Sequence, residues 1–173
     1  MRITLAWAGR PIPHLGKLSE ALGKAFGTSL SVQEIELSGK SWNEERKQYD
    51  AGLLLDELAE KKIPGDKVLL VLREDRDIYV REMNYVFGLA GPKYAVISLA
   101  RLGPRSHGEG DGEKLLERMV KEAVHELGHT FGLPHCEDPK CVMVFSNSIL
   151  GVDKKGALFC DKCREKMKLL KKV

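Results

Sequence analysis

The sequence predicts an α/β (α+β) fold, in which helices cover a twisted, mostly parallel sheet with one antiparallel strand at its edge. Three observations support this prediction. Strand-like apolar runs alternate with helical patterns over residues 3–72, an order that gives parallel strands joined by right-handed crossovers. Two further strand-like runs, residues 84–90 and 94–99, are joined by a connection so short that it forces antiparallel pairing. A long amphipathic helix follows them.

The first three predicted elements are a strand, a helix and a second strand. Residues 3–7 are apolar and predict a strand. Residues 15–26 carry leucines and a phenylalanine at helical spacing, and Gly27 is a common stop signal for a helix. Residues 30–37 predict the second strand.

A second helix and a third strand complete the alternating pattern. Ser41 and Glu44 have the S-x-x-E spacing of a capping box, so we expect a long helix from there to about Lys62. A Pro-Gly turn then leads into residues 68–72, a short apolar run typical of a central strand.

The long helix follows a glycine-rich segment, residues 103–112, and has Asp111 as its expected N-cap. Apolar residues at helical spacing form one side of it: Leu116, Met119, Val120, Ala123, Leu127 and Phe131. Polar residues form the opposite side: Arg118, Lys121, Glu122, His125 and His129. We therefore expect the apolar side to pack on the core and the histidines to face a cleft.

The end of this helix carries the sequence His-Glu-Leu-Gly-His-Thr-Phe-Gly-Leu-Pro-His, residues 125–135. Because successive helical residues turn by about 100°, His125 and His129 lie about 40° apart and can reach one ion. Zinc bound by histidine nitrogens, with one position left open for water, is the catalytic form of such a site. Glu126 is next to a ligand without being one, which suits a general base.

The third histidine requires the helix to end. Gly132 can adopt the left-handed conformation favoured just past a helix end, and Pro134 prevents the helix from resuming. The chain can then bring His135 to the same ion. A histidine pair four residues apart is by itself more often an ordinary surface pair, but the glycine and third histidine at these offsets favour a metal site.

All four cysteines lie in the last quarter of the chain, at a spacing of C-x4-C, eighteen residues and C-x2-C: Cys136, Cys141, Cys160 and Cys163. They can form two disulfides in three possible pairings, or hold one structural zinc ion, and CxxC is also a redox motif. The apolar start, residues 3–8, is too short for a secretion signal. We therefore expect a cytoplasmic protein, in which reducing conditions favour the zinc site.

Length and composition narrow the remaining possibilities. A chain of 173 residues with 31% charged residues fits one globular domain. A net charge of +3 is too mild to imply nucleic acid, and no apolar run reaches membrane-spanning length. The basic tail, residues 161–173, fits a terminal helix with a solvated lysine face better than a membrane or nucleic-acid segment. We expect a monomer without nucleic-acid or membrane partners.

The motif that runs from His125 to Cys163 resembles that of the archaemetzincins, a small group of metzincin zinc peptidases. HExxHxxGxxH with a downstream methionine is the metzincin pattern, and HC-x4-CxM…CxxC is the more particular continuation. The gap between Met143 and Cys160 is about one residue shorter than the spacing of that group. The resemblance implies a compact metzincin-like domain. Residues 1–132 would end in the active-site helix, and residues 133–173 would form a small zinc-bound subdomain.

The resemblance also implies roles for individual residues. The ligands of a catalytic zinc would be His125, His129 and His135, and those of a second, structural zinc Cys136, Cys141, Cys160 and Cys163. Glu126 would be the general base, and Met143 would lie in a turn beneath the metal, although plain core packing also explains a methionine there. The strand before Gly91 would be an edge strand to which a substrate peptide adds, through Tyr85, Phe87, Gly88 and Leu89. An ordinary hairpin is the alternative.

The predicted function is therefore zinc-dependent hydrolysis of a peptide or protein substrate, and two rivals remain. One is a metal-dependent ribonuclease, resembling the bacterial rRNA-maturation endonucleases that use a similar three-histidine spacing. That group lacks a glutamate directly after the first histidine and lacks the four cysteines, so Glu126 argues for peptide hydrolysis. The other is a non-catalytic binding module in which zinc is only structural.

Overall fold

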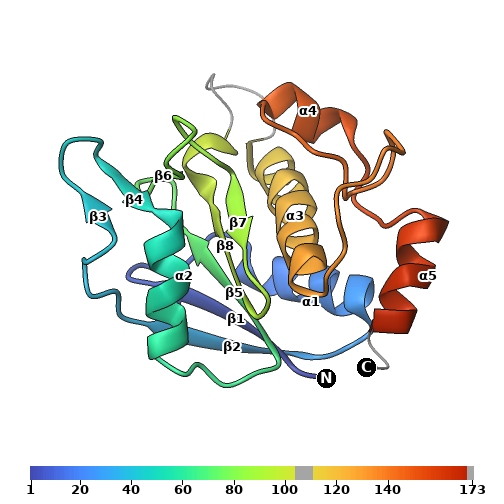
Figure 1. Ribbon diagram of the computed structural model, residues 1–173, viewed down its shortest axis with the longest axis horizontal. Coiled ribbons are helices and arrows are strands. Elements are labelled where there is room, and N and C mark those ends of the chain that lie inside the picture. Colours follow the sequence, from blue (N-terminus) through green and yellow to red (C-terminus); the bar gives the residue numbers. More distant parts are fainter. Residues whose placement is uncertain (104–110, 171–173) are drawn as a thin grey trace.

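A five-stranded sheet forms the centre of the computed structural model, which describes residues 1–103 and 111–170 (Figure 1). The strand order is β2-β1-β5-β8-β7. The first four of these strands are parallel to their neighbours, and only β7, at the edge, is antiparallel. The predicted sheet is confirmed. Its strands are β1 (Ile3–Ala8), β2 (Leu30–Ile35), β5 (Lys67–Leu72), β7 (Gly88–Ala90) and β8 (Tyr94–Ser98).

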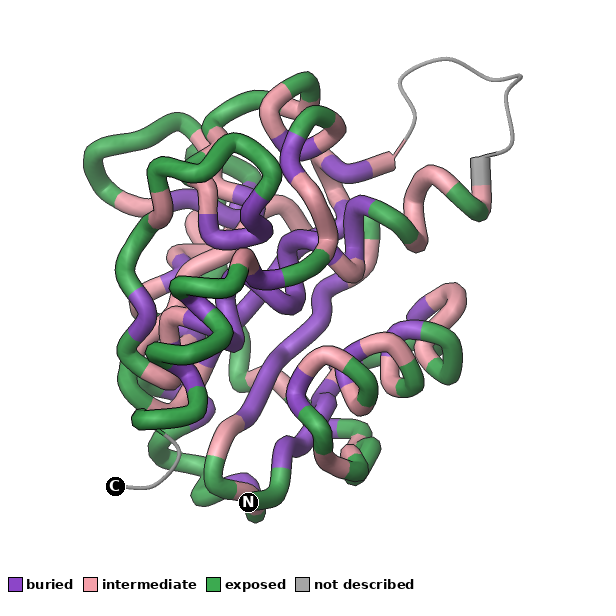
Figure 2. Tube along the Cα trace, turned by 90° about the vertical axis from the view of Figure 1, so that its right-hand side faces the viewer, coloured by how far each residue is buried: buried purple, intermediate pink, exposed green. Residues whose placement is uncertain are grey.

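Helices cover both faces of the sheet. On one face, α1 (Leu15–Phe26) and α3 (Asp111–Thr130) share a core with Leu69 and Val71 of β5. On the other face, α2 (Ala51–Glu60) packs against the alternate residues of the same strand, such as Leu70. Because neighbouring residues of a strand point to opposite faces, the continuous apolar run of β5 is buried on both sides. Figure 2 shows the buried residues running through the middle of the molecule.

The prediction that a helix begins at Ser41 is wrong. The chain first forms a hairpin of β3 (Trp42–Asn43) and β4 (Gln48–Asp50), and β6 (Ile78–Tyr79) joins it in a small second sheet. The ring of Trp42 packs on Tyr49 with centroids 4.9 Å apart. The N-cap of α2 is Asp50, whose side chain accepts a hydrogen bond from the backbone N–H of Leu53 at 3.1 Å.

The C-terminal segment covers the polar side of α3. This segment contains the helices α4 (Ile149–Lys154) and α5 (Asp161–Leu170). Earlier in the chain, a short 3-10 helix, η1 (Leu99–Arg101), follows β8 and precedes α3. Arg118 forms a bidentate ion pair with Asp153, and the Nζ of Lys121 donates to the carbonyl of Val152 at 3.2 Å. Arg118 and Lys121 on the polar side of α3 are therefore buried under this segment, whereas His125 and His129 line a cavity, as predicted.

Most of the glycine-rich connection, residues 103–112, and the side chain of the expected N-cap Asp111 lie outside the described residues. Among the residues that are described, no helix has both the length and the apolar character needed to cross a membrane.

Candidate metal centres and substrate cleft

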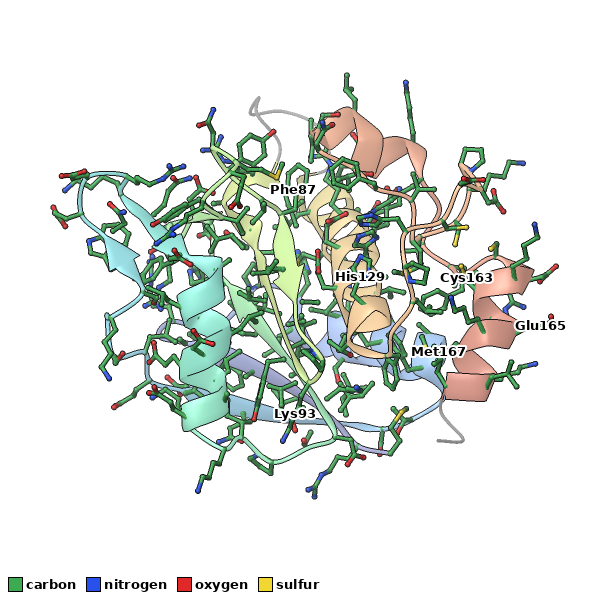
Figure 3. All side chains as sticks on the ribbon, viewed as in Figure 1. Phe87, Lys93, His129, Cys163, Glu165 and Met167 are labelled. Atoms are coloured by element: carbon green, nitrogen blue, oxygen red, sulfur yellow. The ribbon has the colours of Figure 1, made fainter. Side chains whose placement is uncertain are left out.

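The three motif histidines meet at the C-terminal end of α3. His125 and His129 lie one turn apart on the helix, and Gly132, with φ of +87°, ends it so that His135 turns back towards them. One ring nitrogen from each lies within 4.8 Å of the others, and the Nε2 atoms of His125 and His129 are 3.1 Å apart. Zinc–nitrogen bonds of about 2.05 Å in a tetrahedron place two ligand nitrogens about 3.3 Å apart. The spacing of these nitrogens therefore fits a zinc ion. Figure 3 labels His129 on α3.

Backbone carbonyls orient two of the three rings. The Nδ1 of His125 donates to the carbonyl of Val142 at 2.8 Å, and the Nδ1 of His129 donates to that of Leu133 at 2.7 Å. Because a carbonyl can only accept, Nδ1 carries the proton and each Nε2 keeps a free lone pair for a metal. Burial, with the nearby Lys155 ammonium as the second cause, lowers the pKa of His125 to about 3. The ring is therefore neutral, as a ligand must be.

Glu126 is buried beside the histidines and lies against the edge strand at Gly88. Burial raises the pKa of its carboxyl to about 8; the neighbouring carboxylate of Glu122 adds to the rise and the ammonium of Lys155 opposes it. A dication at the histidines also opposes this rise, because opposite charge favours the ionised carboxylate. The position and environment of Glu126 suit a proton acceptor at the floor of the cleft.

A buried ion pair behind the histidines was not predicted. The Nζ of Lys155 lies 2.8 Å from an oxygen of Glu122, and the two side chains are only 1% and 4% exposed. The same Nζ is 3.5 Å from the Nδ1 of His125. The sequence pattern already places Glu122 on the same side of α3 as the histidines, but Lys155 lies far along the chain and carries no motif.

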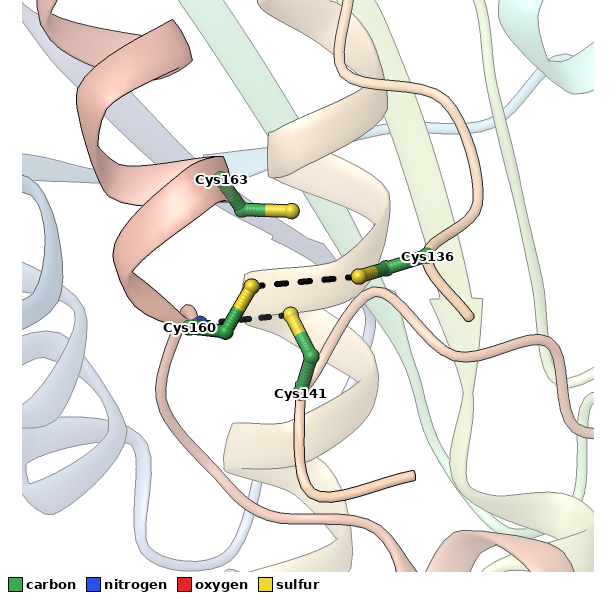
Figure 4. A group of neighbouring side chains, drawn as sticks. All are labelled: Cys136, Cys141, Cys160 and Cys163. Atoms are coloured by element: carbon green, nitrogen blue, oxygen red, sulfur yellow. Dashed lines mark hydrogen bonds between the residues drawn. The ribbon is translucent and has the colours of Figure 1, made fainter. Parts of the chain in front are cut away.

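The four cysteines converge from the segment after α3 and from the start of α5 (Figure 4). Their sulfurs all lie within 4.8 Å of one another, and those of Cys136 and Cys160 are 3.8 Å apart. All four are free thiols, so the disulfide alternative is not realised. Tetrahedral zinc–sulfur bonds of about 2.3 Å place two sulfurs about 3.8 Å apart. The cluster fits a closed zinc site rather than a pair of disulfides.

Met143 lies between the histidine cluster and the cysteine cluster and is bonded to the segment that joins them. It is fully buried, and its carbonyl accepts a hydrogen bond from the backbone N–H of Cys136 at 3.0 Å. A second backbone bond, from Val144 to Cys141 at 3.1 Å, closes the turn that contains it. Because Cys136 directly follows His135, the segment that carries the third histidine is held on one side by this turn.

A cavity of about 500 Å³ opens over the histidines and Glu126. The four expected substrate-binding residues all line it: Tyr85, Phe87, Gly88 and Leu89. The opposite side was missed from the sequence and consists of Phe145, Ser146 and Asn147. The ring of Phe145, 54% exposed, lies 5.2 Å from that of His135. The hydroxyl of Tyr85 donates to the carbonyl of Asn147 at 3.2 Å and so joins the two sides.

Part of the edge strand β7 directs backbone N–H and C=O groups away from the sheet, where a substrate could pair with them. The carbonyl of Phe87 accepts from Ser98, and the N–H of Gly91 donates to Tyr94, so these residues direct their polar groups towards β8. The alternate residues Gly88 and Ala90 must then direct theirs to the outer edge. The outward N–H of Val86 is already bonded to Ile78 at 3.1 Å, which leaves Gly88 and Ala90 as the free groups of β7.

The fold and its donor sets define a zinc metallopeptidase: a three-histidine motif with an adjacent glutamate at the floor of a cleft, beside an open strand edge. The sequence model of Peptidase family M54 matches residues 26–169, and the chain belongs to this family.

Relatives and solved structures agree with this assignment. The chain is 39% identical over 153 residues to the archaemetzincin of Methanocaldococcus jannaschii, covering 87% of this chain and 83% of that protein. The crystal structure of archaemetzincin from Methanopyrus kandleri superposes with a TM-score of 0.88 at 38% identity, covering 100% and 96% of the two chains. A zinc-dependent peptidase from Methanocorpusculum labreanum gives 0.83 at 31% identity, covering 95% and 99%. The resemblance to archaemetzincins and the metzincin-like fold are confirmed.

Proposed function

We propose that the chain hydrolyses peptide bonds with His125, His129 and His135 holding the catalytic zinc and Glu126 acting as general base. The observation that carries this proposal is the convergence of the three histidines with a buried glutamate in one cleft. A zinc ion at the histidines supplies Lewis acidity, which acidifies water and polarises the scissile carbonyl. Glu126, which is buried beside the histidines, accepts the proton of the attacking water and passes it to the leaving amine.

The substrate peptide is proposed to add to the free edge of β7. The outward N–H and C=O groups of Gly88 and Ala90 can pair with an extended peptide, as in other cases of strand addition. Phe87 and Leu89 bond to β8 through their backbones, so their contribution is to shape the cavity wall. Tyr85 fixes the width of the cleft through its bond to Asn147.

We further propose a second, structural zinc at Cys136, Cys141, Cys160 and Cys163. Burial raises the pKa of the Cys141 and Cys163 thiols, although a hydrogen bond from the backbone of Cys163 lowers that of Cys160, so a bound cation is needed to hold all four as thiolates. In this proposal the chain is one domain, with residues 1–132 carrying the sheet and the active-site helix. Residues 133–173 form a small subdomain that the second zinc holds together.

The two rival functions are not favoured. A ribonuclease does not account for the open strand edge beside Glu126, and the family is a peptidase family. A binding module with only structural zinc does not account for two histidines with free Nε2 atoms that converge with a third histidine in a cleft.

The test is the zinc-loaded Glu126→Gln variant with a peptide library and mass-spectrometric readout. We expect unchanged zinc content and a loss of kcat of at least about 10²-fold, the contribution typical of a general base. Glu113→Gln is the matched control, because Glu113 is an exposed glutamate on the same helix. Structured RNA should stay intact in a parallel incubation. If Glu126→Gln cleaves peptides as fast as wild type, the assigned mechanism is wrong.

A further inference from the structure

The carboxylate of Glu126 lies directly on the backbone of the edge strand at Gly88. A Cβ atom at position 88 would lie 2.6 Å from the Cγ of Glu126 and 2.8 Å from both its Cδ and its Oε1. Cβ atoms in proteins do not approach other heavy atoms closer than 3.0 Å. Any residue other than glycine at position 88 therefore displaces either the strand or the glutamate side chain.

The need for glycine at position 88 is a need for space. Gly88 lies in a regular strand, paired with Ile97 of β8, and does not have the left-handed φ that Gly132 has. An alanine can adopt such strand conformations without strain. The proximity of Glu126, and not the backbone conformation, is what excludes a side chain.

The strand is not free to move away from the helix. Backbone hydrogen bonds hold it on both sides of Gly88: Ser98 to Phe87 at 3.0 Å, and Gly91 to Tyr94 at 2.8 Å. On its outer edge, Val86 is bonded to Ile78 at 3.1 Å. A rotation of the Glu126 side chain costs less than the loss of these bonds, so a side chain at position 88 moves the carboxylate.

We propose that Gly88 is a positioning residue for Glu126, an inference that rests on the function proposed above. The missing side chain at position 88 creates the space in which the carboxylate lies at the edge where the substrate backbone pairs. The same residue directs its own N–H and C=O outward along that edge. Gly88 therefore lets the carboxylate of Glu126, the proton acceptor, lie next to the backbone groups that pair with the substrate peptide.

The kinetic test compares Gly88→Ala with Gly91→Ala, both zinc-loaded. Gly91 follows the same strand, and a Cβ there meets only ordinary contacts, at 3.7 Å from Leu55 and 3.8 Å from Tyr94. We expect kcat of Gly88→Ala to fall about 10²-fold, as for a small misplacement of a reacting group, with little change in KM or zinc content. Gly91→Ala should behave as wild type. An unchanged kcat in Gly88→Ala, or an equal loss in both variants, overturns the inference.

If Gly88→Ala folds poorly, a double-mutant cycle of unfolding temperatures tests the inference instead. All three atoms that a Cβ would meet are removed by Glu126→Ala. Gly88→Ala should therefore lower the unfolding temperature less in the Glu126→Ala background than in wild type; an equal or larger loss there overturns the inference. The two proposals can fail separately. Activity in Glu126→Gln refutes the function, whereas an inactive Glu126→Gln with a fully active Gly88→Ala refutes only the role of Gly88.

Discussion

The sulfur of Met143 packs on Gly128 so closely that no side chain fits between them. A Cβ at position 128 would lie 2.5 Å from the Sδ and 3.1 Å from the Cε of Met143, and 3.3 Å from the ring of Phe159. Gly128 stands between the two helical histidines in the motif, on the side of α3 that faces the later turn. The methionine of that turn therefore explains why the motif has glycine at this position.

Gly128→Ala should destabilise the protein, although alanine favours a helix. Overpacking a core typically costs about 1–3 kcal/mol, which exceeds the gain of up to about 1 kcal/mol from replacing a helical glycine. Because the turn that contains Met143 must shift, zinc affinity at the histidines should fall as well. Thermal unfolding and chelator competition measure the two effects. Gly16→Ala is the control, since Gly16 is helical with nothing within 4 Å of its Cβ position. Equal behaviour of the two variants would contradict this packing argument.

Replacing Cys160 and Cys163 by serine should weaken zinc binding at the histidines, although neither cysteine contacts them. The reason is the chain of contacts from the cysteine cluster through Cys136 to Met143 and His135. Zinc titration with a chelating indicator measures the affinity of each site. If the variant loses the structural zinc and binds the catalytic zinc as tightly as wild type, the two sites are merely neighbours.

Lys155→Met should be strongly destabilising because it leaves Glu122 buried without its partner. Removing one member of a buried ion pair costs about 3–5 kcal/mol, while replacing both members is often near neutral. Urea unfolding of the zinc-loaded protein should therefore show that Lys155→Met/Glu122→Gln recovers most of the loss. The exposed pair of Arg10 and Asp75 is the comparison, and Arg10→Met should cost little. A double variant as unstable as the single one would argue against the pair.

The pair of Arg118 and Asp153 should make a pH-dependent contribution to stability. The hydrogen-bonded guanidinium of Arg118 holds the pKa of the Asp153 carboxyl below its ordinary value, while burial opposes the shift. A lowered carboxyl pKa stabilises the folded state above the unfolded pKa of about 3.9, and this contribution is lost as pH falls through the folded value.

Asp153→Asn should accordingly cost about 1–2 kcal/mol between about pH 5 and 7, and the difference from wild type should shrink below about pH 4. Denaturant unfolding of both proteins across this range, at the same zinc loading, measures it. Zinc release in acid affects both proteins alike and leaves the difference intact. A difference that does not change with pH would show that the pair is not ionised as described.

The sequence predicts the features that depend on residues close together in the chain. The helix ending at Gly27, the alternation of strands and helices that gives the parallel sheet, the histidine set from His125 to His135 and the two close cysteine pairs are all visible as local patterns. The predicted helix start at Ser41 is wrong because contacts between distant residues decide the structure there. A capping-box spacing is a local signal, and the pairing of Tyr49 with Ile78, far along the chain, outweighs it.

The contacts that complete the site are also non-local. Nothing in the residues around Glu122 indicates that Lys155 will be its partner, and nothing around Gly88 indicates that Glu126 will lie on it. Both contacts arise because α3 lies between the edge strand and the C-terminal segment. Such contacts depend on how elements pack and not on the order of residues within any one of them.

The partners of His125 and His129 are backbone carbonyls, those of Val142 and Leu133. A side-chain partner can be removed by one substitution, but every residue type offers the same carbonyl. The outer layer of this histidine site thus needs no particular side chain at positions 142 and 133. Packing is what limits substitution there, because Val142 and Leu133 are both buried in the core. A residue that preserves the packing and the path of the chain at these two positions keeps the orientation of the rings, whereas an insertion or deletion between His129 and Met143 would move the carbonyls.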